Sequence, residues 1–328
     1  VQQDDDRLKL LAGECLEEYL GDDEISDPDI DFQDISTFLK RKTKAQLIEL
    51  FHELSVQFPE MARELSDRKQ LNSGNAKEIT TRLRGEIQEI GCEPGWQNYW
   101  QNEGYTPDYS GIRKKLKTLL NAGHTEEVLT LGRELITVGC RQVEESDDEG
   151  ETAREIASCM PLIVDALEQS NLDSAEKLSW ALDAVLEDNY YLCEAFEEYL
   201  HEKHPKTSWN KLSDQLLSRL NSSKPNKLAN DFSRKFNRDQ LSNWTIHALE
   251  YAGRKTEIIP LSMAEAELTE SYDRLVKRLI DAKRYEDAEE WIFKGIHATK
   301  EEWRGTASGL RNKFLEIRTI QKNWPVVT

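Results

Sequence analysis

The sequence lacks the features that mark membrane and secreted proteins. None of its apolar runs approaches the roughly 20 residues that a membrane-spanning helix needs. Its five cysteines lie far apart, are odd in number, and include no Cys-x-x-Cys pair of the kind that holds zinc. We therefore expect reduced thiols, no membrane association, no cofactor in this chain and a cytoplasmic location.

An excess of positive charge is also lacking, since the formal net charge is −19. Proteins bind nucleic acid through clustered Lys and Arg side chains that contact its phosphates. The net negative charge of this chain repels those phosphates. Two local basic runs, KRKTK at 40–44 and RKKLK at 113–117, are typical of solvated helix faces. We predict no direct nucleic-acid binding. The alternative requires two groups of basic side chains on one face: Lys114, Lys115 and Lys117 with Arg234, Lys235 and Arg238.

Catalytic motifs are missing as well. The sequence contains neither a glycine-rich phosphate loop nor a Gly-x-Ser-x-Gly elbow. In HEKH, His201 and His204 are three residues apart, whereas zinc proteases need histidines four apart on one helix face. We interpret the two histidines as a surface pair, and we expect no catalytic residue and no enzymatic activity.

The apolar residues are sparse, at 38% of the chain against 32% charged residues, but they recur with helical spacing. Runs such as Val128, Leu131 and Leu135 repeat at intervals of three and four, and no segment alternates as a strand would. The sequence therefore predicts an all-α fold without strands. Helix starts are predicted at capping-box patterns beginning with Thr43, Asn75, Thr152 and Asp173, and helix ends at Gly91, Gly123 and Gly253.

Three segments resemble one another: LLNAGHTEEVLTL (119–131), ALEYAGRKTEIIPL (248–261) and LIDAKRYEDAEEW (279–291). They align on Ala122, Ala252 and Ala282, each before a small or basic turn. This pattern is typical of helical hairpins stacked in a tetratricopeptide-like α-solenoid. We expect a short helix and acidic linker over 1–33, a small helical unit over 34–92 and the solenoid over 93–328, truncated at its C-terminus.

The run QVEESDDEGETAREIASC (142–159) is the most unusual stretch, because acidic residues crowd its centre. Three interpretations stay open: a solvated turn between two helices, a docking surface for a partner, and a cation site that uses Asp147 and Glu149. The spacing is not that of an EF-hand. The docking interpretation involves five of its acids: Glu144, Asp147, Asp148, Glu149 and Glu151.

A second candidate surface is the segment Asp231–Arg254, in which Arg234, Arg238 and Asp239 precede a tryptophan. It is either a helix with surface ion pairs or a basic groove that accepts an acidic peptide. An enzymatic or cation-dependent module would instead require four carboxylates to converge in one pocket: Asp147, Glu149, Asp183 and Glu187.

Several long segments in the same order resemble the helical region that follows the finger in bacterial SWIM zinc-finger proteins. These include AGHTEEVLTLGRELI, WALDAVLEDNYYLC and AEEWIFKGIHATKEEWRG, and the resemblance covers about residues 112–328. The Cys-x-Cys and Cys-x-His ligand pairs of that family do not occur here. The resemblance implies a zinc finger upstream of Val1 in a longer parent protein, with zinc only there.

The sequence thus predicts a non-catalytic scaffold that binds another protein or peptide. Two alternatives remain open: a cation-dependent accessory or enzymatic module that uses residues 144–151, and a nucleic-acid-associated module in which the missing finger contacts DNA.

Overall fold

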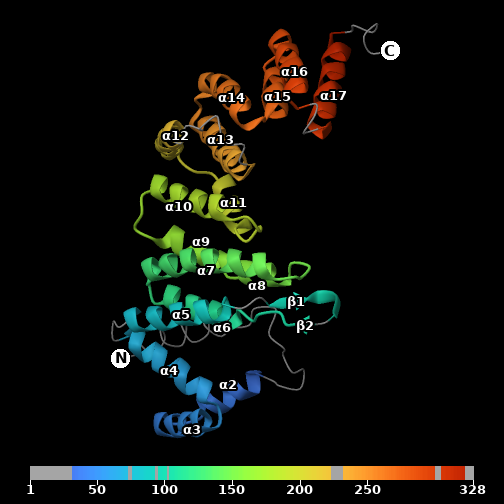
Figure 1. Ribbon diagram of the computed structural model, residues 1–328. Coiled ribbons are helices and arrows are strands. Elements are labelled where there is room, and N and C mark those ends of the chain that lie inside the picture. Colours follow the sequence, from blue (N-terminus) through green and yellow to red (C-terminus); the bar gives the residue numbers. More distant parts are fainter. Residues whose placement is uncertain are drawn as a thin grey trace. The chain divides into compact units, whose positions relative to one another are not determined.

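The computed structural model describes residues 32–72, 76–92, 95–101, 103–222, 232–299 and 304–321. Figure 1 shows that this part of the chain is almost entirely helical, which confirms the all-α prediction. The chain divides into two compact units, an N-terminal unit Val1–Lys69 and a C-terminal unit Gln70–Thr328. Residues 1–31, which hold nearly all of the short helix and acidic linker expected over 1–33, lie outside the described residues.

The described part of the N-terminal unit contains α2 (Phe32–Lys40), α3 (Lys44–Gln57) and most of α4 (Pro59–Asn72). The predicted capping box at the start of α3 is confirmed. The Gln46 backbone N–H donates to Thr43 Oγ1 over 3.3 Å, and the Thr43 N–H donates to Gln46 Oε1 over 2.9 Å. These reciprocal bonds satisfy two backbone donors that would otherwise lack partners.

The C-terminal unit begins with α5 (Ala76–Ile90), a small β-hairpin and α6 (Ser110–Asn121). The hairpin pairs β1 (Trp96–Asn98) with β2 (Glu103–Gly104) around the 3-10 turn η1 (Tyr99–Gln101), so the prediction that the chain has no strands is wrong here. Gly104 has a φ of +140°, and an added Cβ would lie only 2.6 Å from the Trp96 Cα. The hairpin therefore requires glycine at this position.

The rest of the described C-terminal unit is helical: α7 (Thr125–Glu145), α8 (Glu151–Ala157), α9 (Met160–Gln169), α10 (Ser174–Glu187), α11 (Glu194–His201), α12 (Lys206–Ser222), α13 (Phe232–Ala252), α14 (Lys255–Thr269), α15 (Tyr272–Asp281), α16 (Tyr285–Thr299) and α17 (Arg304–Ile320). Their packing follows chain order (Figure 1). For example, α12 packs on α13, α13 on α14, α14 on α15 and α15 on α16. Contacts between elements distant in sequence are few, as in α-helical folds built from local units.

The core of the C-terminal unit is divided into clusters. The largest extends from Ala76 of α5 to Ala248 of α13, and a second joins α14 to α17. A small third cluster contains Ile246, Leu249 and Ile258 of α13 and α14. Each group of helices therefore buries its apolar face against its neighbours along the chain, and the sparse apolar composition suffices for this.

All three segments that align on Ala122, Ala252 and Ala282 form the same turn between two helices. The backbone N–H of His124, Arg254 and Arg284 donates to the carbonyl five residues earlier, over 3.0, 2.8 and 2.9 Å. The residue before each has a left-handed backbone, with φ of +81° at Gly123 and Gly253 and +59° at Lys283. This is the Schellman geometry that ends helices, so the predicted ends at Gly123 and Gly253 are confirmed.

The remaining predictions of helix starts have mixed outcomes. Asp173 caps α10 in a full capping box, as predicted. The prediction for Thr152 is wrong, since α8 starts at Glu151 after Gly150, whose φ is +94°. Asn75 lies outside the described residues. The predicted end at Gly91 is confirmed, because α5 ends at Ile90.

The described thiols are unpaired: Cys92, Cys140, Cys159 and Cys193. Burial raises the pKa of Cys159 to about 11, which keeps this thiol protonated and unreactive at neutral pH. None of the helices in the described ranges has both the length and the apolar character needed to cross a membrane.

Candidate functional site

The acidic run forms a structured turn between α7 and α8. Asp148 holds this turn, because its carboxylate accepts from the Gly150 N–H over 2.7 Å, from the Thr152 N–H over 3.0 Å and from the Thr152 hydroxyl over 2.5 Å. A carboxylate at a helix N-terminus satisfies free backbone donors and interacts favourably with the helix dipole. Asp148 therefore has a structural role that explains its place in the run.

The start of the run is tied to the β-hairpin. The Asp147 N–H donates to the Trp96 carbonyl over 2.8 Å, and the Gly95 N–H donates to the Ser146 hydroxyl over 3.1 Å. At its end, Glu151 pairs with Arg154 over 3.2 Å and accepts from the Glu149 N–H over 2.8 Å. Much of the backbone of this turn is thus satisfied within the chain, as in a well-ordered helix connection.

Arg238 and Asp239 of α13 each form an ion pair with a residue on a neighbouring helix. Arg238 donates to both carboxylate oxygens of Glu265 on α14, over 2.7 and 2.8 Å, and to the Leu220 carbonyl over 3.2 Å. Asp239 pairs with Arg274 of α15. A partner that bound Arg238 would have to displace Glu265. The side chain of Arg234 lies outside the described part of the chain.

Two further basic residues of the nucleic-acid alternative have acidic partners. Lys115 lies 2.5 Å from Glu86 of α5, and Lys235 lies 2.7 Å from Glu270 at the end of α14. Neutralised lysines contribute less to a phosphate-binding surface than unpaired ones.

The HEKH pair contacts more of the fold than the surface interpretation implied. His201 Nδ1 lies 3.1 Å from the Tyr251 hydroxyl of α13, and His204 Nε2 lies 2.6 Å from the Tyr199 carbonyl. The His204 ring centroid is 6.0 Å from that of Trp209 on α12. The two histidines thus pack where α11, α12 and α13 meet. Their contacts there include the aromatic residues Tyr199, Trp209 and Tyr251.

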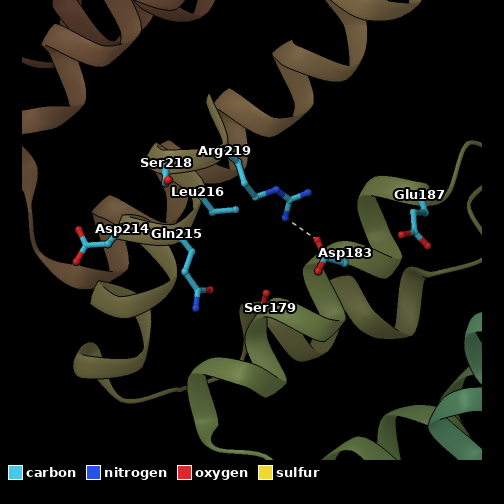
Figure 2. A pocket seen from close by; sticks show the side chains of 8 residues that line it. All are labelled: Ser179, Asp183, Glu187, Asp214, Gln215, Leu216, Ser218 and Arg219. Atoms are coloured by element: carbon cyan, nitrogen blue, oxygen red, sulfur yellow. Dashed lines mark hydrogen bonds and ion pairs between the residues drawn. The ribbon is translucent and has the colours of Figure 1, made fainter. Parts of the chain in front are cut away.

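An open groove of about 850 Å³ lies between α10 and α12 (Figure 2). Its lining is mostly short or polar, with one buried leucine. The lining residues are Ser179, Asp183 and Glu187 of α10 with Asp214, Gln215, Leu216, Ser218 and Arg219 of α12. Exposed serine and glutamine side chains offer both donors and acceptors to a ligand that lies in the groove.

One ion pair joins the two sides of the groove. Arg219 Nη1 lies 2.6 Å from Asp183 Oδ1, and Figure 2 shows the two side chains pointing toward one another. Both are partly exposed, and exposed pairs stabilise proteins by at most about 1 kcal/mol. A ligand can therefore replace this pair at little cost.

The other two carboxylates of the groove pair with arginines from elements outside it. Arg133 of α7 lies 3.2 Å from Glu187 and stacks 4.3 Å from the Trp180 ring centroid. Arg254, in the α13–α14 turn, lies 2.5 Å from Asp214. The hydrogen bonds of Arg254 to Glu257, and then to Asp214, raise the pKa of its guanidinium. All three carboxylates are thus paired, so the groove is polar rather than strongly acidic.

Of the four carboxylates that an enzymatic or cation-dependent module would bring together, Asp183 and Glu187 line the groove. Asp147 and Glu149 lie in the α7–α8 turn and are absent from the groove lining. Across the ranges that the structure describes, no three or more His, Cys, Asp or Glu side chains are arranged to hold a metal ion.

The sequence did not point to the residues that α12 contributes to the groove. Gln215, Ser218 and Arg219 are spaced three and four apart, so a common helix face was visible. Nothing in the sequence indicated that this face lies opposite Ser179 and Asp183. That juxtaposition depends on the packing of α12 against α10.

Searches of protein-family models, of curated proteins and of solved structures found no match to this chain.

Proposed function

We propose that this chain is a non-catalytic scaffold that binds another protein or peptide, and that the groove between α10 and α12 is its main contact site. The observation that carries the proposal is the groove itself: an open depression of about 850 Å³ between two helices, lined mostly by polar side chains. Such a surface accommodates an extended peptide, whereas small-molecule sites are more enclosed and more apolar.

We further propose that residues 93–328 form a tetratricopeptide-like α-solenoid. Two observations support this: the three Schellman turns share one geometry, and helices pack mainly on their neighbours in the chain. Both are expected of helical hairpins that stack in series. Solenoids of this kind bind peptides along surfaces built from successive hairpins, and the α10–α12 groove is such a surface.

The resemblance to SWIM zinc-finger proteins supports a longer parent protein, in which the finger carries zinc and contacts DNA or protein. In that arrangement the helical chain recruits a partner and the finger supplies any contact with nucleic acid. The net charge of −19 fits a chain that avoids nucleic acid itself.

The acidic turn is a second candidate contact, through the carboxylates that do not hold the turn together. Asp147 and Glu149 can be changed without removing the Asp148 cap. If the turn docks a basic partner, replacing these two by Ala weakens binding, and it does so more at low salt than at high salt.

Random peptides displayed on phage and selected against the full chain provide a probe for the groove. A photo-crosslinking amino acid replaces Gln215, which lines the groove, or Ser222, which is exposed on the same helix but is not part of the lining. We expect selected peptides to crosslink at position 215 and not at position 222. Failure to select any peptide, or equal crosslinking at both positions, would contradict the proposal.

A further inference from the structure

The N-terminal unit exposes an unusual amount of apolar surface. Of the residues from 33 to 69 whose side chains the structure describes, none is buried. Exposed large apolar side chains occur on all three helices: Ile35, Phe38, Ile48, Phe51, Val56, Phe58 and Leu65. Single helices are marginal in water and gain most of their stability from packing of an apolar face. Exposed apolar side chains in this number, none of them balanced by a buried core in the described part of the unit, point to a surface that is covered by another segment.

Positive charge borders this apolar face. Lys40, Arg41, Lys42 and Lys44 lie at the corner between α2 and α3, which the Thr43 capping box holds in place. The Lys42 ammonium group is 4.7 Å from the ring centroid of Phe38, whose side chain is 51% exposed. Apolar and basic groups are thus adjacent, and an acidic amphipathic segment is the complementary ligand.

The chain itself contains a segment with this chemistry. Residues 4–24 carry nine acidic and two basic side chains. Leu8, Leu11, Cys15 and Tyr19 recur at intervals of three and four, the spacing that predicts one apolar helix face. Leu10 falls on the opposite side of that helix.

The length of chain before α2 allows this segment to reach the face. Residues 21–31 span up to roughly 36 Å when extended. The face is smaller, since α3 has 14 residues and is therefore about 21 Å long. Attachment to the same chain gives an effective concentration in the millimolar range, so even a weak contact is populated. A second copy of the chain, as an alternative occupant of the face, has no such advantage. It is also repelled, because each copy carries a net charge of −19.

We propose that the exposed apolar face of α2–α4 is a docking site for an acidic amphipathic segment, and that the chain's own residues 4–24 occupy it. Leu8, Leu11 and Tyr19 would contact the apolar face, and the surrounding acids would contact the basic corner at 40–44. This inference concerns the N-terminal unit and is independent of the α10–α12 groove.

The test is hydrogen exchange of the α2 and α3 amides in the full chain, followed by mass spectrometry. The variant Leu8→Ser/Leu11→Ser/Tyr19→Ser removes the apolar face of the segment, and Leu10→Ser is the matched control. We expect the triple variant to exchange at least about tenfold faster over 32–57, with exchange in α5–α10 unchanged and the control like wild type. A synthetic peptide of residues 4–24 at millimolar concentration should restore slow exchange in the triple variant.

A charge variant provides an independent measurement. Lys40→Glu/Arg41→Glu changes exposed residues, so the helices themselves should persist, as circular dichroism can check. Faster exchange of α3 in this variant, and in wild type at high salt, supports the proposal. Wild-type exchange rates in the triple variant would overturn it. So would protection of α3 that depends on protein concentration, which would identify a second copy as the occupant.

Discussion

Arg238 of α13 and Glu265 of α14 form a bidentate ion pair, with Nε 2.7 Å from Oε2 and Nη2 2.8 Å from Oε1. Their side chains are only 11% and 6% exposed. A buried pair of this geometry offsets the cost of removing both charges from water, but only while both partners are present. The pair therefore fixes how α13 meets α14.

Removing one partner of this pair should be costly. We expect Arg238→Ala to lower the free energy of unfolding by about 3–5 kcal/mol, because it leaves the Glu265 carboxylate buried without its partner. The double variant Arg238→Met/Glu265→Leu should be close to wild type, because neither charge remains. Urea titrations of the three proteins measure this. A double variant as unstable as Arg238→Ala would show that the loss comes from packing and not from the unpaired charge.

Lys283 occupies the left-handed position of a turn where the two related turns have glycine. An L-residue in this conformation costs about 1–2 kcal/mol, and glycine does not. We expect Lys283→Gly to raise the free energy of unfolding by up to about 1 kcal/mol, since the added chain entropy of glycine offsets part of the gain. The reverse change, Gly253→Ala, should destabilise. Destabilisation by Lys283→Gly would contradict the equivalence of the three turns.

Gly132 of α7 allows α9 to approach closely. A Cβ at this position would lie 2.6 Å from Ile163 Cγ2 and 3.0 Å from its Cδ1. We expect Gly132→Ala to destabilise by about 1–3 kcal/mol through overpacking. In a double-mutant cycle, Ile163→Ala should relieve part of that loss. Gly309→Ala in α17 is the control, because its Cβ meets open space, and it should stabilise by roughly 0.5–1 kcal/mol.

Asp148 and Glu151 accept hydrogen bonds from the backbone of the acidic turn, whereas Asp147 and Glu149 are exposed. Asp148→Ala should lower stability by about 0.5–2 kcal/mol, because it removes the acceptor for the Gly150 and Thr152 donors. Asp147→Ala/Glu149→Ala should leave the melting temperature almost unchanged. Calorimetry of the two variants separates these outcomes. Equal losses in both would mean that the run stabilises the fold as a group of charges rather than through Asp148.

Much of the helical organisation was predictable because it depends on local physics. The capping boxes at Thr43 and Asp173 and the helix ends at Gly123 and Gly253 involve residues within a few positions of one another. The β-hairpin was missed because strands of three and two residues are too short to show alternation. Thr152 was mistaken for a cap because Asp148, four residues earlier, performs that role instead.

The candidate site was less predictable because it joins segments distant in the sequence. The pairing of Arg219 with Asp183 depends on how α12 packs against α10, and no pattern within either helix indicates it. The acidic run was a candidate site because of its composition alone. The residues of the groove have an ordinary composition, and the groove forms only because α10 and α12 pack against one another.

The most direct test of the scaffold proposal is the affinity of a phage-selected peptide for three forms of the chain: wild type, Ser218→Trp and Ser222→Trp. Both serines are exposed on α12, but only Ser218 lines the groove. We predict that Ser218→Trp, which fills the groove, weakens binding at least about tenfold, while Ser222→Trp binds like wild type. Equal affinity for all three proteins would contradict the proposal that the α10–α12 groove is the binding site.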